Sequence, residues 1–154
     1  MVAFRDVDKY DAARLYGVLH PYQRREIRSS LGHDIERCIL NCVNRSKEAY
    51  TVTEDNGQVL AMFGIVPLSI LDSDRATPWM VSSSNISNYP RKLLTYSRMV
   101  IDHWRNQYDY MFNYIDNRYY SSLRWAKKIG FTVHPAEPYG IEQLPFNKID
   151  MRNN

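Results

Sequence analysis

The sequence predicts a single α/β domain, and two segments carry this prediction. Residues 110–115 are apolar or aromatic at nearly every position, as in a strand covered on both faces, and an amphipathic helix follows that ends at Gly130. Residues 49–53 and 59–66 flank an Asp-Asn-Gly turn, which is a strong signal for an antiparallel hairpin. The chain has 154 residues, the length of one domain, which we expect to span residues 1–154.

The first third of the chain is predicted to be mostly helical. A short strand over residues 2–5 comes first, and a helix with apolar positions between 12 and 19 follows it. His20-Pro21 ends this helix, because proline disfavours the helical conformation of the residue before it. Two further helices are expected at residues 22–31 and 34–47.

The middle of the chain is predicted to return to a strand and then to a helix. A polar loop is expected at residues 72–77, and residues 79–82 read as a short strand. Pro90 suits the first turn of a helix, because its missing N–H has no partner there in any case. The helix carries apolar residues as far as Trp104.

The end of the chain is predicted to be a hairpin that completes the sheet. Its strands are expected at residues 131–134 and 141–149. Pro135 and Pro138 are expected in the connection, because proline cannot donate a hydrogen bond to a strand ladder.

Composition excludes several classes of protein. The net charge of +3 is mild and the basic residues are scattered, so we expect no nucleic-acid partner. No apolar run approaches the ~20 residues that span a bilayer, so we expect no membrane partner. The N-terminus has no basic region followed by an apolar core, which predicts synthesis in the cytoplasm without a secretion signal.

The two cysteines are predicted to be small core residues. Cys38 and Cys42 lie four positions apart on a predicted helix, too far for an ordinary disulfide. Together with Ile35, Ile39 and Val43 they form one apolar stripe. Their spacing matches no standard zinc pattern, so we expect no metal site.

The helix that ends at Gly130 carries a recognisable motif. Trp125, Lys128, Ile129, Gly130 and Phe131 supply an aromatic residue, then a basic and an apolar residue, then Gly-Phe. This segment and the strand before it resemble the acyl-CoA-binding strand and helix of the GCN5-related N-acetyltransferases (GNAT). The resemblance implies a GNAT-like single domain of the α/β (α+β) class, with a mixed, mostly antiparallel sheet of six to seven strands flanked by helices. It also implies acetyl-CoA as the co-substrate.

A longer stretch is similar to acetyltransferase-like proteins of short-tailed bacteriophages, the family of a small internal virion protein. The matching residues follow the same order in both and are Pro78-Trp79-Met80-Val81, Ser97-Arg98, Asn113-Tyr114, Arg124-Trp125 and Gly130-Phe131. This resemblance implies a phage protein in the cytoplasm of the host cell, with virion association as a further expectation. Its oligomeric state stays open, because sheet edges and tyrosines would allow a dimer but nothing requires one.

The expected coenzyme loop departs from the GNAT pattern, because residues 82–92 contain no glycine. Glycines there normally let backbone N–H groups approach the pyrophosphate. Serine, asparagine and basic side chains remain as donors and charges, and the alternative is a solvated helix start. The candidate coenzyme-binding residues are Ser82, Ser83, Ser84, Asn88, Arg91, Lys92, Asn117 and Arg124.

The catalytic acid and base are also unusual for this family. Ala126 stands where many members have a tyrosine that protonates the leaving thiolate, so Tyr119 and Tyr120 are the candidate replacements, with packing or capping as the alternative. Glu26 is the preferred candidate for the base, because the segment before the cysteine helix is similar to that of the phage family. Its alternative reading is an exposed helix charge. Asp116 and His134 are the other candidate bases.

Two functions remain after these observations. The first is an acetyl-CoA-dependent N-acetyltransferase of phage type, which acts on an amine of an acceptor protein or small molecule. The alternative is a catalytically inactive GNAT-fold phage protein, which serves in the virion or its assembly or binds a phage or host protein partner. The missing glycines, Ala126 and the twelve tyrosines favour this alternative.

Overall fold

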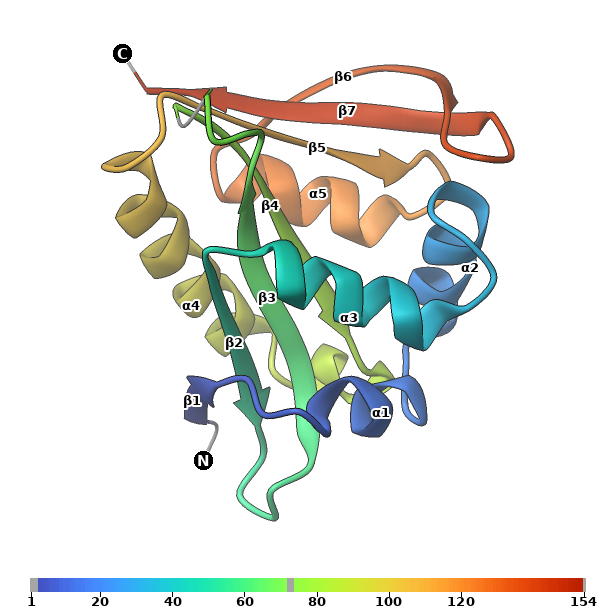
Figure 1. Ribbon diagram of the computed structural model, residues 1–154, viewed down its shortest axis with the longest axis vertical. Coiled ribbons are helices and arrows are strands. Elements are labelled where there is room, and N and C mark those ends of the chain that lie inside the picture. The colour runs from blue at the N-terminus through green and yellow to red at the C-terminus, as the bar shows by residue number, and fades with distance from the viewer. Residues whose placement is uncertain (1–2, 72–73, 154) are drawn as a thin grey trace.

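A computed structural model describes residues 3–71 and 74–153 of the chain, and seven strands of the described residues form one sheet (Figure 1). The strand order is β1-β2-β3-β4-β5-β7-β6, and all neighbours are antiparallel except β4 and β5. The predicted class, a mixed and mostly antiparallel sheet flanked by helices, is confirmed. The strands are β1 (Ala3–Asp6), β2 (Glu48–Thr53), β3 (Val59–Pro67), β4 (Arg75–Ser82), β5 (Tyr110–Asp116), β6 (Thr132–Tyr139) and β7 (Leu144–Arg152).

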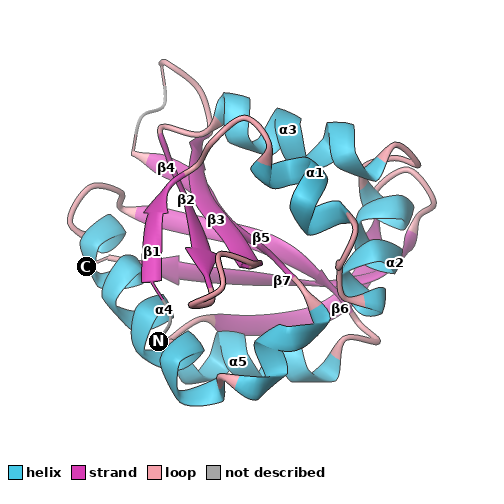
Figure 2. Cartoon of the chain, turned by 90° about the horizontal axis from the view of Figure 1, so that it is seen from below, coloured by secondary structure: helices cyan, strands magenta, loops and turns pink. Residues whose placement is uncertain are grey.

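Helices cover both faces of the sheet. Figure 2 shows α1 and α3 on one side of the strands and α4 and α5 on the other. None of the helices in the described ranges has the length and hydrophobicity that crossing a bilayer requires. The helices are α1 (Asp11–Tyr16), α2 (Pro21–Ser30), α3 (Ile35–Arg45), α4 (Pro90–Arg105) and α5 (Tyr120–Lys128), and a 3-10 helix η1 (Ser84–Asn88) precedes α4.

The sheet separates two hydrophobic clusters. Residues 59–65 of β3 are buried, and their side chains are divided between the two clusters. Leu60 and Ile65 belong to the cluster that also holds residues of α4 and α5, whereas Met62 packs with residues of α1, α2 and α3. Cys38 and Cys42 pack against this second cluster as small, partly buried residues, as predicted.

The predicted boundaries of the last hairpin are wrong. β6 runs through Pro135 and Pro138 to Tyr139, so the prolines lie within the strand and not in its connection. β6 is an edge strand with a register irregularity between Val133 and Ala136, and both features tolerate a residue without an N–H.

Two other boundaries differ from the prediction, and one predicted residue is not described. β4 begins at Arg75, inside the predicted loop, because it pairs with both β3 and β5 there. Helix α1 ends at Tyr16, and Leu19 instead forms an isolated bridge with Ser83. The predicted first strand included Val2, which lies outside the described residues.

Asp11 joins β1, α1 and β2 through a buried network. Its carboxylate is fully buried and accepts two hydrogen bonds from the guanidinium of Arg5, at 2.8 and 2.9 Å. It also accepts one from the hydroxyl of Thr51 at 2.7 Å and one from the backbone N–H of Asp8 at 2.8 Å. Burial raises the pKa of Asp11, but these hydrogen bonds more than offset it and lower the pKa from 3.8 to about 2.

The tip of the β6–β7 hairpin lies against the end of α2. The backbone N–H groups of Ile141 and Glu142 donate to the carbonyl groups of Ser30 and Ser29, at 3.2 and 3.1 Å. Gly140 has a φ of 76°, and a Cβ added to it would lie 2.5 Å from Cα of Ser30. The hairpin therefore satisfies last-turn carbonyl groups of α2 and requires glycine at the contact.

Replacing Gly140 by alanine is expected to break this contact. We expect Gly140→Ala to lower the free energy of unfolding by about 2 kcal/mol more than Gly57→Ala, measured by urea denaturation. Gly57 is a matched control, because its φ of 82° carries similar strain and no atom lies within 4 Å of its added Cβ. Equal losses in the two variants would contradict the close packing of hairpin and helix.

Candidate active site

The parallel strands β4 and β5 diverge soon after they begin. They pair only at Arg75 with Tyr110 and at Ala76 with Met111. Beyond these pairs, the amide of Asn113 bridges the gap by donating to the carbonyl oxygen of Pro78 at 2.7 Å, while its oxygen accepts from the N–H of Tyr114. The sheet thus has an opening in the middle, and backbone groups beside it are satisfied by a side chain.

A cavity occupies this opening and extends to three helices. Most of its lining is apolar and comes from β3, β4, β5, α4 and α5, and the side of α2 contributes two polar residues. Such a lining, with few polar groups, is typical of sites for small molecules. The cavity-lining residues that the argument uses are Gln23, Glu26, Asn113, Tyr114, Ser122 and Trp125.

Glu26 lies at the end of the cavity that α2 forms. Its Oε2 accepts a hydrogen bond of 2.9 Å from the backbone N–H of Asp116, at the end of β5. Burial raises the pKa of Glu26 from 4.5 to about 7, although the N–H of Asp116 and the charge of Arg25 oppose the shift. A carboxylate with this pKa can gain and lose a proton near neutral pH, as a general base must.

The other two candidate bases have fixed partners. Asp116 accepts hydrogen bonds from the guanidinium of Arg118 at 2.7 and 3.0 Å. Burial alone would raise the pKa of Asp116, but Arg118 has the larger combined effect, so the pKa is lowered. His134 lies on β6 and contacts Asp150 at 2.8 Å, and it does not line the cavity. Among the three, the structure brings Glu26 to the cavity.

The two candidate tyrosines lie in different environments. Tyr119 is buried and stacks on His20 with ring centroids 5.6 Å apart. Burial raises the pKa of Tyr119, and hydrogen bonds with Gln23 and Ser82 act in the opposite direction. Tyr120 begins α5 and is 68% exposed, and neither tyrosine lines the cavity.

The glycine-free loop is a 3-10 helix between β4 and α4. Ser82 and Ser83 are buried, whereas Ser84 and Asn88 are exposed on η1. The hydroxyl of Ser83 is buried and has no hydrogen-bond partner among the described residues. A buried hydroxyl without a partner is costly and therefore unusual in a folded protein. The site residues of this loop therefore divide into a buried pair and an exposed pair.

The remaining candidate residues are mostly exposed. Arg91 and Lys92 lie on the first turn of α4, which has no side-chain cap, and Lys92 lines the cavity. Asn117 donates its backbone N–H to the carbonyl of Pro145 at 3.1 Å in the turn after β5. Arg124 is exposed on α5 and does not line the cavity. The structure therefore brings Lys92 to the cavity and leaves Arg124 outside it.

Three cavity residues were not predicted as site residues from the sequence. Asn113 and Tyr114 lie on β5 and Gln23 lies one turn before Glu26 on α2. A polar residue within the apolar run 110–115 was a usable signal for Asn113. Gln23 carried no such signal, because a polar residue on a short helix is ordinarily exposed.

Within residues 3–71 and 74–153, no group of three or more metal-binding side chains is found. The candidate site therefore consists of a cavity, a carboxylate with a raised pKa and the free first turn of a helix.

Sequence comparison and structure comparison give different results for this chain. No protein-family model matches it, and no curated protein is similar to it in sequence. Many solved structures match its fold. One is an acetyltransferase of the GNAT family from Streptococcus pneumoniae, with a TM-score of 0.68 and 14% identity over 99% of both chains.

Two further structures share the fold over nearly the whole length. The ribosomal-protein-alanine N-acetyltransferase from Brucella melitensis is 13% identical, with a TM-score of 0.70 over 97% of this chain and 99% of the other. The yncA structure from Salmonella typhimurium, which contains acetyl-CoA, is 12% identical, with a TM-score of 0.67 over 99% and 94%. The chain therefore has the GNAT fold, and these identities show the fold alone.

Proposed function

We propose that the protein is an acetyl-CoA-dependent N-acetyltransferase of phage type, which transfers an acetyl group to an amine of a protein or small molecule. The observation that carries the proposal is the placement of Glu26, with its raised pKa, at one end of the cavity between β4 and β5. The motif resemblance to short-tailed phage proteins, described in the sequence analysis, supports the phage source and, with it, the host cytoplasm or the virion as the location.

The residues at the start of α4 fit an anionic group of the co-substrate. The first-turn N–H groups of Arg91 and Lys92 have no intrahelical partner, and no side chain caps them. The positive end of the 16-residue helix and two basic side chains favour a phosphate there. The unpartnered hydroxyl of Ser83, at the end of β4, supports a bound group in the same region.

The proposed reaction uses Glu26 to prepare the acceptor. The carboxylate takes a proton from the ammonium group of the acceptor, and the free amine attacks the thioester carbonyl carbon. The new C–N bond forms as the C–S bond breaks. The leaving thiolate takes a proton, and the nitrogen releases its second proton, which replaces the one that the thiolate received. The apolar lining of the cavity excludes water from the reacting carbonyl.

Tyr119 is the proposed source of the final proton. It is buried beside Ser82 at the end of β4, and burial raises its pKa, which keeps the hydroxyl protonated at neutral pH. Ala126, at the place of the usual tyrosine, is fully buried and has no proton to give. Tyr119 is therefore better placed for this role than the exposed Tyr120.

Titration calorimetry with acetyl-CoA tests the proposal. We expect binding with a micromolar Kd, about −8 kcal/mol, and a roughly tenfold loss when Arg91→Ala and Lys92→Ala are combined. The matched control combines Lys127→Ala with Lys128→Ala. It removes the same charge, but from the last turn of a different helix, α5. Absence of binding at millimolar acetyl-CoA would overturn the proposal.

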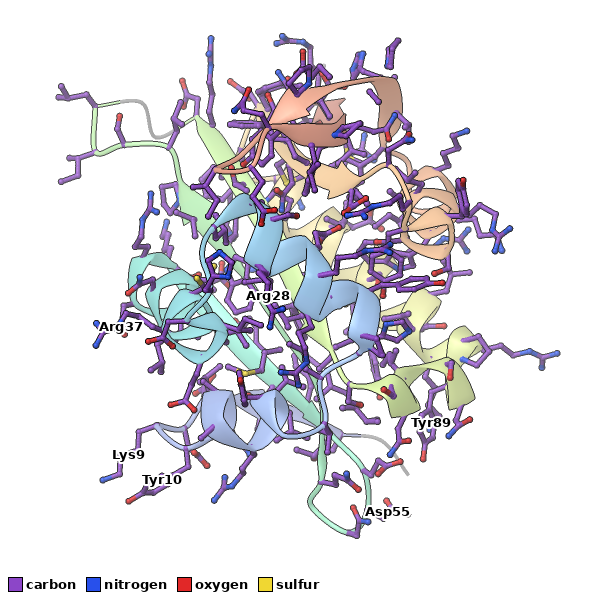
Figure 3. The ribbon with its side chains drawn as sticks, turned by 90° about the vertical axis from the view of Figure 1, so that its right-hand side faces the viewer. Lys9, Tyr10, Arg28, Arg37, Asp55 and Tyr89 are labelled. Atoms are coloured by element: carbon purple, nitrogen blue, oxygen red, sulfur yellow. The ribbon has the colours of Figure 1, made fainter. Side chains whose placement is uncertain are left out.

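The second candidate is a GNAT-fold phage protein without catalysis, which acts in the virion or binds a partner protein. The hydroxyl of Tyr89 donates to the carboxylate of Glu54 at 2.9 Å, so a negative charge lies near the first turn of α4. Figure 3 shows Tyr89 and Asp55, the next residue after Glu54, at the same end of the molecule. This candidate predicts no binding of acetyl-CoA and a stable complex with a phage or host protein.

A further inference from the structure

A groove lies at the end of the sheet where β3 ends and β4 begins. It has a volume of about 600 Å³, within the range of about 300–1,000 Å³ that is usual for small-molecule sites. No described residue lines both this groove and the cavity that holds Glu26, so the groove is a separate site. Its lining includes Arg45, Lys47, Leu68, Ile70, Asp74 and Tyr108.

Two basic side chains line the groove from neighbouring parts of the chain. Arg45 is the last residue of α3, and Lys47 lies between α3 and β2. Both are exposed, and neither side chain forms an ion pair or a hydrogen bond with another described residue. One carboxylate, that of Asp74, also lines the groove, so these two cations and one anion sum to a charge of +1. This net positive charge favours a bound anion.

Another part of the lining is apolar and uncovered. Val66 and Pro67 end β3, and Leu68 and Ile70 follow in the loop that projects beside α3 (Figure 2). Leu68 is 47% exposed, and Ile70 and its neighbour Leu71 are each 99% exposed, so the last two make almost no contact with the rest of the chain. Exposed apolar side chains that gather beside a groove are typical of a binding site. The apolar part of a ligand would cover them.

Tyr108 adds a buried hydrogen-bond donor to the same lining. It lies after α4 and is 4% exposed, and its hydroxyl has no hydrogen-bond partner among the described residues. Burial and the charge of Glu48 raise the pKa of Tyr108, so the hydroxyl keeps its proton at neutral pH. Glu48 accepts instead from the side chains of Tyr50 and Trp104, at 2.8 and 3.3 Å. A buried donor without an acceptor is unusual, and it is a sign independent of the two cations that this lining lacks an acceptor.

We propose that the groove binds a free single-chain amphiphile with a carboxylate head group, the chemistry of a fatty acid. The head group meets Arg45 and Lys47, and the chain covers Leu68 and Ile70. A guanidinium and an ammonium group both form charge-assisted hydrogen bonds with a carboxylate. The concave shape suits one molecule better than a membrane surface, and Asp74 would repel a densely anionic bilayer more than a single head group. The inference does not depend on the proposed acetyl transfer.

Titration calorimetry with decanoate, kept below its critical micelle concentration, tests the inference. We expect a Kd below about 1 mM. Acetate and decyltrimethylammonium should not bind measurably at the same concentrations, because acetate lacks the chain and decyltrimethylammonium lacks the anionic head. Saturation with acetyl-CoA should leave the Kd of decanoate unchanged, because no described residue lines both sites.

Charge variants test the contact with the head group. We expect Arg45→Gln combined with Lys47→Gln to weaken decanoate binding roughly tenfold, because two charge-assisted contacts are lost. Lys127→Gln combined with Lys128→Gln removes the same charge from exposed positions on α5 and should leave the Kd unchanged.

A pair of isoleucine variants tests the contact with the chain. We expect Ile70→Ser to weaken decanoate binding about threefold or more, because apolar area that the chain covers is removed. Ile141→Ser is the comparison, because Ile141 is 59% exposed in the β6–β7 turn, away from the groove, and it should leave the Kd unchanged. Both side chains are exposed, so both variants should fold.

Each contrary outcome removes a stated part of the inference. Binding of decanoate that acetyl-CoA abolishes, or that the groove variants do not weaken, would overturn the groove as its site. Equal binding of decyltrimethylammonium would overturn the role of the cations. Binding to phosphatidylglycerol vesicles without binding of free decanoate would assign these side chains to a membrane surface and overturn the free ligand. None of these results bears on acetyl transfer, so the proposed function stands or fails separately.

Discussion

Glu26→Gln is expected to lower kcat/KM for acetyl transfer by roughly 10²–10⁴-fold, the usual contribution of a general base. The glutamine side chain can still accept the N–H of Asp116, so the local structure is retained while the proton acceptor is lost. The measurement is thiol release with the best acceptor, and Glu137→Gln, an exposed carboxylate on β6, is the control. A loss of less than about threefold would contradict the role of Glu26.

The pH dependence gives an independent test of the same residue. Glu26 must be ionised to accept a proton, and its pKa is raised from 4.5 to about 7. Wild-type kcat/KM should therefore rise with pH and level off above about 7, and this break should disappear in Glu26→Gln. A break that persists in the variant would assign the titration to another group.

The effect of Glu26 on the stability of the fold should depend on pH in the direction opposite to its effect on kcat/KM. Because the folded state raises the pKa of Glu26, protonation is favoured in the fold, and stability falls as pH rises from 4.5 to about 7. Glu26→Gln removes this cost, so the variant should unfold at a higher temperature than wild type at pH 8. Lower activity with higher thermal stability would rule out unfolding as the cause.

Asp11→Ala is expected to lower the free energy of unfolding by about 3 kcal/mol, measured by urea denaturation at pH 7. The substitution leaves the buried hydroxyl of Thr51 without its acceptor and removes the group that joins Arg5 to α1. The matched control is Asp102→Ala, an exposed aspartate on α4, which should stay within about 0.5 kcal/mol of wild type.

The pH dependence of stability distinguishes Asp11 from other carboxyl groups. Its pKa is lowered from 3.8 to about 2, so its stabilising contribution is present above pH 3.8 and is lost as pH falls toward 2. Wild type should lose more stability than Asp11→Ala over this interval. Parallel curves for the two proteins would show that Asp11 is not the group responsible.

The elements predicted most closely were those with a strong local pattern. The hairpin of β2 and β3 and the start of α4 at Pro90 agree within one or two residues, because an Asp-Asn-Gly turn and a first-turn proline act locally. The prediction missed the start of β4 and the last residues of β6. β4 extends back to Arg75 because two neighbouring strands pair with it, and no local pattern contains that information.

The candidate site was less predictable than the fold. Glu26 was selected from a resemblance, and no local pattern predicts its raised pKa, which comes from burial in the folded chain. The groove was no more predictable, because Arg45 and Lys47 looked like two of many scattered basic residues. The groove exists only where the ends of α3, β3 and α4 meet, and no sequence pattern encodes that meeting.

The two edges of the sheet have unequal capacity to accept another strand. At one edge, Pro135 and Pro138 lie within β6 and lack the N–H groups that an added strand would need. At the other edge, β1 spans only Ala3–Asp6 and exposes charged side chains. Contact between copies at high concentration should therefore use side-chain surfaces and not continuation of the sheet, which would keep the protein from polymerising through its strands.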